Sequence, residues 1–323
     1  MKSDIRGSME HLAQMFFGRP ASANEIMERA GIGVWEHFYP RKYAAPSGYT
    51  SPKTPAAVFT ATTIAALEVK RQLGISAVDH DPVTNNTAAI GEVVRRLWMP
   101  TYWVGRELVQ SAFETEPPKS LKPSDLPMPL PGAVFLLPLN TLVNPDGEDS
   151  SWLAVATSET YAGEKRLGIC TGTSCGANYM ASIKNHETLA VHENTDSGEF
   201  HPITGEIGKL SEADRLFSLR LARIGITLIM LMNARPALVE THTKAEKPPT
   251  SGKAARKLAS PNWIGRTYRA PRSEHAGGTH ASPHVHWRRG HWRHQAHGPA
   301  NSLRKDIWIE PMIIGATTQQ KAA

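Results

Sequence analysis

The feature that most constrains the fold is a helix whose second half is apolar on every side. Ser211-Glu212-Ala213-Asp214 is typical of a helix start, and the pattern predicts a helix from there to about Ala234. Residues Ile224–Met232 are almost all apolar, so this half has to be enclosed by other elements. The run is far shorter than the roughly 20 residues of a membrane-spanning helix. We therefore expect a central buried helix.

Short apolar segments before this helix predict a sheet. Ala133–Leu137 and Trp152–Ala156 flank the turn sequence Asn144-Pro145-Asp146-Gly147, in which proline presets φ and glycine tolerates positive φ. Further strands are predicted at Arg166–Thr171, Tyr179–Ile183 and Thr188–His192. The spacing of these segments predicts an antiparallel meander.

The N-terminal third contains helix signals. Ser22-Ala23-Asn24-Glu25 has the spacing of a capping box, and Thr54-Pro55 places proline at the first position of a helix that runs towards Gly74. The pattern from Thr87 to Phe113 is interrupted by Pro100, which predicts two helices or one kinked helix. The proline-rich residues 115–132 predict an extended connector.

These patterns predict an α+β fold class, with a helical N-terminal region, a central antiparallel meander with a buried helix, and a basic C-terminal β-module. The predicted boundaries are a helical N-terminal region at 1–120, a central α+β domain at 121–242, a basic linker at 243–262, a His/Arg/Trp-rich C-terminal β-module at 263–316, and a frayed tail at 317–323. The clearest strand of the C-terminal module is predicted within Ile307–Ile314.

Positive charge is concentrated in one segment of the chain. Residues 251–305 contain eleven Lys/Arg and one acid, Glu274, which gives +10 against +6 for the whole chain. Seven of the fourteen histidines lie in the same segment. Charge of one sign gathered in one segment indicates a polyanionic partner, and RNA is the partner that we expect.

The segment Ser282–His294 carries the side chains that favour RNA. Guanidiniums offer planar donor forks for phosphate, and indoles can stack on unpaired bases. In an extended strand, alternate residues share a face, so His291 and Arg293 are predicted to lie together with Trp287 and Arg289. The predicted nucleic-acid-binding residues are His284, His286, Trp287, Arg288, Arg289, His291, Trp292 and Arg293.

The same residues allow other interpretations. Two histidines beside a phosphate can act as general base and acid, with an arginine that stabilises the developing charge. A metal-independent ribonuclease would use His286, His291 and Arg289 as its catalytic candidates. A surface hairpin with core tryptophans and solvated arginines, or a site for an acidic protein, would also fit. Retention of labelled RNA without cleavage, in the presence of EDTA, would distinguish a binder from an enzyme.

No cofactor or metal is expected. The sequence lacks a Walker A loop and a dinucleotide-binding glycine fingerprint. His284 and His286 have no accompanying CxxC pair, and the surrounding Lys/Arg would repel a cation. Cys170 and Cys175 are too few for a disulfide framework, and Met1–Glu10 does not have the pattern of a secretory signal. A cytoplasmic location is expected.

The C-terminal residues also resemble a known family. Pro283-His284, then His286-Trp287-Arg288-Arg289-Gly290-His291, then Trp308–Pro311 and Ile313-Ile314-Gly315 resemble the close of a type V-A anti-CRISPR family. Weaker similarity extends upstream to further segments, namely Trp263–Arg266, Leu228–Pro236, Phe135–Pro138 and Trp152–Val155.

The resemblance implies a protein of a phage or plasmid in a bacterial host. Members of that family lower the amount of the type V-A effector nuclease by acting on its synthesis. A relative of this kind is expected to recognise the N-terminal peptide of the nascent effector during translation and to cause loss of the message. The expected partners are therefore RNA, as message or on the ribosome, and a nascent peptide. A general RNA-binding regulator of another host transcript is the alternative.

Overall fold

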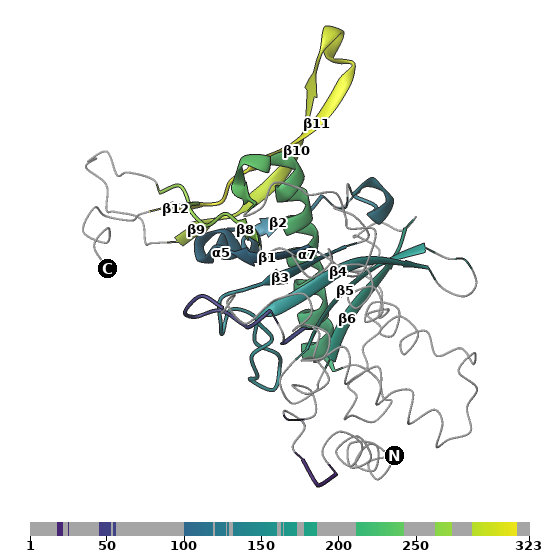
Figure 1. Ribbon diagram of the computed structural model, residues 1–323. Helices are drawn as coiled ribbons and strands as arrows, with labels where there is room; N and C mark the ends of the chain where they lie inside the picture. The colour runs from purple at the N-terminus through teal and green to yellow at the C-terminus, as the bar shows by residue number, and fades with distance from the viewer. Residues whose placement is uncertain are drawn as a thin grey trace, which may run out of the picture.

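The computed structural model describes most of the chain from Pro100 onwards (Figure 1). The described residues are 18–21, 25, 45–52, 54–55, 100–118, 120–126, 128, 132–159, 163, 165–172, 178–185, 211–241, 262–272 and 286–314. Predictions that fall on 22–24, 26–44, 56–99, 188–192, 243–261 and 317–323 lie outside the described residues. Within them the protein is a mixed α/β structure, mostly sheet, with two helices of two turns or more.

A seven-stranded mixed sheet forms the body, with the strand order β6-β5-β4-β3-β1-β8-β7. The strands are β1 (Thr101–Val104), β3 (Gly132–Leu136), β4 (Trp152–Glu159), β5 (Lys165–Gly172), β6 (Asn178–Lys184), β7 (Val239–Glu240) and β8 (Asn262–Ile264). Strands β3 to β6 run antiparallel in chain order, which confirms the predicted meander. The turn at Asn144-Pro145-Asp146-Gly147 is also confirmed, since Gly147 has a φ of 84° and its N–H donates to the Asn144 carbonyl at 3.0 Å.

Strand β1 corrects the prediction of helix on both sides of Pro100. Residues Thr101–Val104 form a buried strand that pairs in parallel with β3 on one side and β8 on the other. All of its side chains are β-branched or aromatic, so they suit a pleated sheet better than a helix surface. The helix α5 (Arg106–Phe113) begins only after Gly105. A Cβ at Gly105 would lie 2.0 Å from the Gly265 carbonyl oxygen, so only glycine permits this corner.

The helix α7 (Glu212–Ala234) is the predicted central helix. The Ser211 hydroxyl accepts a hydrogen bond from the Asp214 N–H at 3.1 Å, as expected for an N-cap. Its residues Ile224–Leu231 are all buried against the sheet, and α5 packs beside it. By length and composition α7 could cross a bilayer, but 67% of its apolar window is buried inside the protein, as in the core helix of many soluble proteins.

Two small sheets complete the described structure. One has the order β11-β10-β2, formed by β2 (Thr115–Glu116), β10 (Gly290–His297) and β11 (Leu303–Ile309). The other pairs β9 (His286–Arg288) with β12 (Met312–Ile314), so the strand predicted within Ile307–Ile314 is confirmed as two strands, β11 and β12. Single 3-10 turns lie at η1 (Pro123–Asp125), η2 (Pro236–Leu238) and η4 (Pro299–Asn301). Strand β8, predicted to belong to the C-terminal module, lies inside the seven-stranded sheet.

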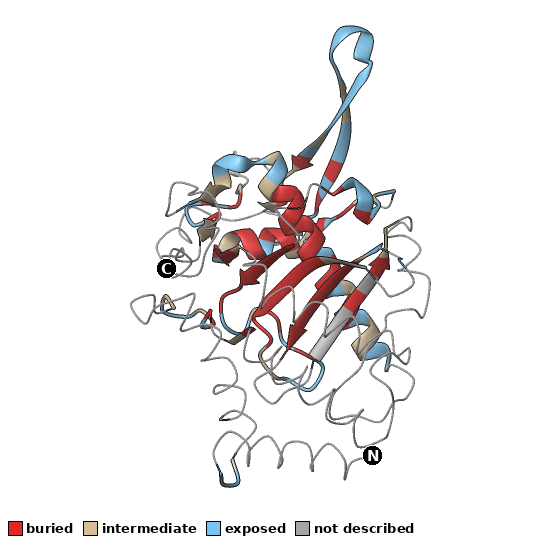
Figure 2. Cartoon of the chain, turned by 45° about the vertical axis from the view of Figure 1, so that its right-hand side comes forward, coloured by how far each residue is buried: buried red, intermediate tan, exposed pale blue. Residues whose placement is uncertain are grey.

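The β10–β11 pair, residues 290–309, projects from the body as a long ribbon, here called the hairpin (Figure 1). Only its base is buried, whereas its outer half is exposed (Figure 2). The exposed half therefore contributes little to the apolar core.

A tight contact between α7 and the sheet lies at Gly225. A Cβ there would come within 3.0 Å of an Ile169 methyl and 3.1 Å of a Val155 methyl. We predict that Gly225→Val lowers the free energy of unfolding by about 1–3 kcal/mol, because the core is overpacked. Urea unfolding measures this, with Ala213→Val on the exposed start of α7 as the control. An unchanged midpoint for Gly225→Val would contradict the described packing.

Candidate nucleic-acid interface

The two faces of the hairpin differ because the strand register places side chains in pairs. In an antiparallel pair, directly opposed residues lie on the same face. One face carries Trp292 opposite Trp308, then His294 opposite Asp306, then Ala296 opposite Arg304. The other face carries His291, Arg293, Gln295 and His297 on β10, with Ile309, Ile307, Lys305 and Leu303 opposite them. The two tryptophans are buried at 9% and 3% exposure and mark the base.

The base of the hairpin lies against the corner where α5 ends. Strand β10 pairs in parallel with β2, and the Gly290 N–H donates to the Glu114 carbonyl at 2.9 Å. A Cβ at Gly290 would lie 2.7 Å from Thr115 Oγ1 and from Pro311 Cδ. Glycine at position 290 therefore allows the backbone of the hairpin to pack closely against the corner that follows α5.

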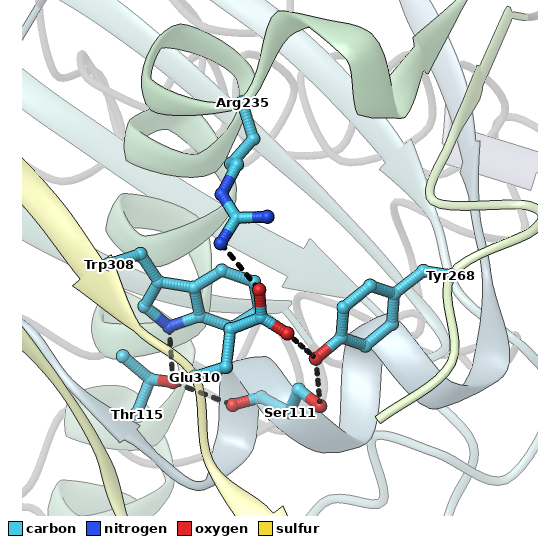
Figure 3. Close-up of polar contacts among 6 residues, drawn as sticks. All are labelled: Ser111, Thr115, Arg235, Tyr268, Trp308 and Glu310. Atoms are coloured by element: carbon cyan, nitrogen blue, oxygen red, sulfur yellow. Dashed lines mark hydrogen bonds and ion pairs between the residues drawn. The ribbon is translucent and has the colours of Figure 1, made fainter. Parts of the chain in front are cut away.

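A chain of polar contacts fixes the base (Figure 3). The Trp308 indole N–H donates to Thr115 Oγ1 at 3.1 Å, and the Thr115 hydroxyl donates to the Ser111 carbonyl at 2.7 Å. Glu310, one residue beyond β11, accepts from the Arg235 guanidinium and, at 3.3 Å, from the Tyr268 hydroxyl. These contacts join the hairpin to α5, to the C-cap of α7 and to the segment after β8.

Tyr268 remains protonated in this network. Burial raises the pKa of its hydroxyl, the Ser111 hydroxyl opposes that shift from 3.2 Å, and the nearby Glu310 carboxylate raises the pKa further. A protonated hydroxyl can donate to Glu310, as the geometry requires. The Arg235 guanidinium also lies 5.8 Å from the centre of the Trp308 ring, so the carboxylate and the indole share one cation.

The predicted binding residues divide between two sheets. His286, Trp287 and Arg288 lie on β9, Arg289 lies between the strands, and β10 begins at Gly290. The prediction of a single extended strand across this segment is therefore wrong, although His291 and Arg293 do share a face. His284 lies outside the described residues. Trp292 is buried, so its ring is not available to stack on a base in this conformation.

The arginines of this region are exposed and mostly without carboxylate partners. Arg289 forms an ion pair with Glu116 at 2.8 Å, in which both side chains are more than half exposed. Within the described part of the chain, no ion pair involves Arg288, Arg293, Arg304 or Lys305. His294 contacts Asp306 through Nδ1 at 2.8 Å. The result is a positive surface that the described part of the body does not neutralise.

Arg304 and Lys305 belong to the basic segment but are not among the predicted site residues. Their strand, β11, brings them opposite Ala296 and Gln295 of β10. The sequence carries a signal for them in the polar residues Arg304-Lys305-Asp306, which stand directly before the apolar run Ile307-Trp308-Ile309. Only the register shows that Lys305 shares the face of Arg293, whereas Arg304 lies on the opposite face.

Other candidate chemistry is limited in this part of the chain. The catalytic candidates His286 and His291 lie on strands of different sheets. Among the residues that the structure describes, no group of three or more His, Cys, Asp or Glu side chains is placed to hold a metal ion. Cys170 is a buried residue of β5, paired with Ala154 of β4, and burial raises the pKa of its thiol, so it suits a core position.

The described residues define a class of protein. It has a mixed α/β body around one buried helix, and a basic hairpin that projects from the body and is hydrogen-bonded to it at its base. The sequence model that describes the anti-CRISPR type V subtype A2 family matches residues 102–316, which is more than half of the chain. The chain therefore belongs to this family and has an anti-CRISPR function, which confirms the resemblance drawn from the C-terminal residues. No curated protein sequence gives a match.

The anchoring of the hairpin can be tested at Thr115, which is 2% exposed. We predict that Thr115→Val lowers the free energy of unfolding by about 1–3 kcal/mol, because the buried Trp308 N–H is left without an acceptor. Thr115→Ser is the matched control, since it keeps the hydroxyl and removes only a methyl group. Thermal unfolding of both variants provides the measurement, and equal stability of the two would argue against the hydrogen bond.

Proposed function

We propose that this anti-CRISPR protein suppresses production of a type V-A CRISPR effector in the bacterial cytoplasm. In this proposal it recognises the N-terminal peptide of the nascent effector, contacts RNA through the basic hairpin, and promotes loss of the message under translation. It acts as a binding and regulatory protein of a phage or plasmid.

Membership of the type V subtype A2 family supports the choice of target system. The single structural observation in favour of RNA contact is the positive surface on the hairpin and beside it. Arg288 and Arg293 are exposed and without a carboxylate partner among the described residues. Exposed guanidiniums that the fold does not use are suited to phosphate, which they can bind through two parallel hydrogen bonds.

Recognition of a peptide and recognition of a message make different predictions for one reporter. We expect a fluorescent protein that carries the first codons of the effector gene to be silenced. Synonymous recoding of those codons should preserve silencing, because the peptide is unchanged. A compensated pair of frameshifts that keeps almost all nucleotides but changes the peptide should abolish it. Reporter mRNA and fluorescence are both measured, and the reverse pattern would show that the message is what the protein recognises.

The RNA contact is tested by removing two charges together. We expect Arg288→Ala with Arg293→Ala to reduce loss of the reporter mRNA at least about tenfold, as removal of two charge-assisted phosphate interactions allows. The fold should remain intact, because both side chains are exposed and neither forms an ion pair with the described residues. Quantitative PCR of the reporter measures the effect at matched protein levels.

Arg215→Ala is the control for this experiment. Arg215 lies at the start of α7 and forms a local ion pair with Glu212, far along the helix from Arg235 beneath the hairpin. Silencing should be unchanged in this variant. Full silencing by a stably expressed double variant would contradict the RNA contact. A stable complex with the mature effector, without any change in message level, would instead identify a direct inhibitor.

A further inference from the structure

We infer that the hairpin binds structured RNA, with base-paired grooves, in preference to an unpaired strand. This inference rests on the RNA contact in the proposed function and specifies which RNA the hairpin fits. It follows from the side chains on the hairpin, the distribution of its charge and the rigidity of its base.

The hairpin exposes no Phe, Trp or Tyr ring for stacking on bases, and its exposed rings are the smaller imidazoles of His291, His294 and His297. Proteins that bind single strands without sequence preference combine a positive groove with exposed aromatic side chains, and each stacked base contributes about 1–3 kcal/mol. Within the hairpin, residues 290–309, all of them described, the sequence has two aromatic side chains of the Phe, Trp and Tyr types, Trp292 and Trp308. Both are buried at the base. The large rings that contribute most to stacking on unpaired bases are therefore not exposed on the hairpin.

The cations lie on both faces of the ribbon. Arg304 shares a face with Ala296, whereas Arg293 and Lys305 lie on the opposite face. An unpaired RNA strand would pass along one face of the ribbon and would not contact the cations on the other face. A ribbon that is positive on both faces suits a groove bordered by two rows of phosphates. This is the arrangement in base-paired RNA, and its wide, shallow minor groove is the one that side chains can reach.

Exposed aliphatic side chains lie beside the cations on one face of the hairpin. Leu303 is 53% exposed and Ile307 is 36% exposed, and both share a face with Arg293 and Lys305. Aliphatic groups pack well against sugar carbons but, unlike rings, do not stack on a free base. Their position beside the cations suits a surface of riboses and phosphates.

The hairpin is also shaped before it binds. Its base is held by β2 and by the Trp308–Thr115 hydrogen bond, and its tip is a turn in which Gly298, Ala300 and Asn301 all have positive φ. The Arg304 guanidinium donates to the Asn301 carbonyl at 2.8 Å, which ties β11 to the tip. A preorganised ribbon gives up little conformational freedom on binding, so it fits a partner whose shape is also fixed.

The test compares two RNA probes of equal length and charge with the full-length protein. One is a stem-loop with about 16 base pairs, the span that duplex-binding domains cover. The other is a poly-uridine strand with the same number of phosphates. Fluorescence anisotropy over a range of salt concentrations gives both affinities and salt slopes. We expect the stem-loop to bind at least about tenfold more tightly.

The charge variants connect that preference to the hairpin. We expect Arg304→Ala with Lys305→Ala to reduce stem-loop affinity and to lower the salt slope by about 1 for each phosphate that the variant no longer neutralises. Arg304→Lys with Lys305→Arg should restore binding, because the charge is retained. Arg215→Ala should behave as the unmodified protein. The restored variant keeps the test valid even if the alanine variant folds poorly.

Each outcome bears on a different claim. Equal or tighter binding of poly-uridine would overturn the preference for structured RNA and leave the proposed RNA contact intact. Undiminished stem-loop binding by the Arg304→Ala and Lys305→Ala variant would overturn the role of the hairpin. Binding of neither probe would overturn this inference together with the RNA contact, and would leave an acidic protein as the partner of the positive surface.

Discussion

The position of the hairpin depends on one buried indole N–H that finds its acceptor on the body. Trp308 donates to Thr115, which lies 193 positions earlier in the chain. A buried donor left without an acceptor costs about 1–3 kcal/mol, whereas an exposed ion pair such as Arg289–Glu116 contributes about 0–1 kcal/mol. The hydrogen bond and the close approach at Gly290 therefore fix the base, and the ion pair adds little. Trp292, the neighbour of Trp308 across the strands, has no partner for its own N–H among the described residues.

A second set of contacts at the base connects the hairpin to the core of the body. Glu310 joins Arg235, at the C-cap of α7, to Tyr268, in the segment that follows β8. Because α7 is the buried helix on which β4, β5 and β6 pack, the interaction at Glu310 links the hairpin to the centre of the core. The domain boundary expected before residue 263 does not correspond to a break in the sheet, since β8 pairs with β1.

Local patterns in the sequence predict the elements that depend on neighbouring residues. The N-cap at Ser211, the turn at Gly147 and the meander β3–β6 follow from capping, φ preference and spacing. Strand β1 is not predicted from the sequence for two reasons. The helical pattern that precedes Pro100 continues beyond this proline, and a central parallel strand of four residues is too short to show a periodicity of its own. The burial of Trp292 agrees with one alternative that the sequence leaves open, a surface hairpin with core tryptophans. Alternation along β10 places Trp292 on the face away from Arg293. That this face meets the body depends on a distant contact, because Trp308, which lies opposite Trp292, donates a hydrogen bond to Thr115.

The charge on the hairpin opposes its own folding, and this is the strongest physical reason to assign it a partner. Arg293 lies opposite Ile307, which places Lys305 diagonally across the ribbon on the same face. Like charges at such positions repel, and among the described residues Asp306 is the only acid between Arg289 and Ile309. Asp306 faces the other way and contacts His294. Among the described residues Arg293 and Lys305 form no ion pair, and the base is held instead by apolar burial, by the Trp308–Thr115 hydrogen bond and by the Arg235–Glu310 ion pair. In the proposed RNA contact, the approach of phosphates would relieve this repulsion, and that gain would add to the free energy of binding.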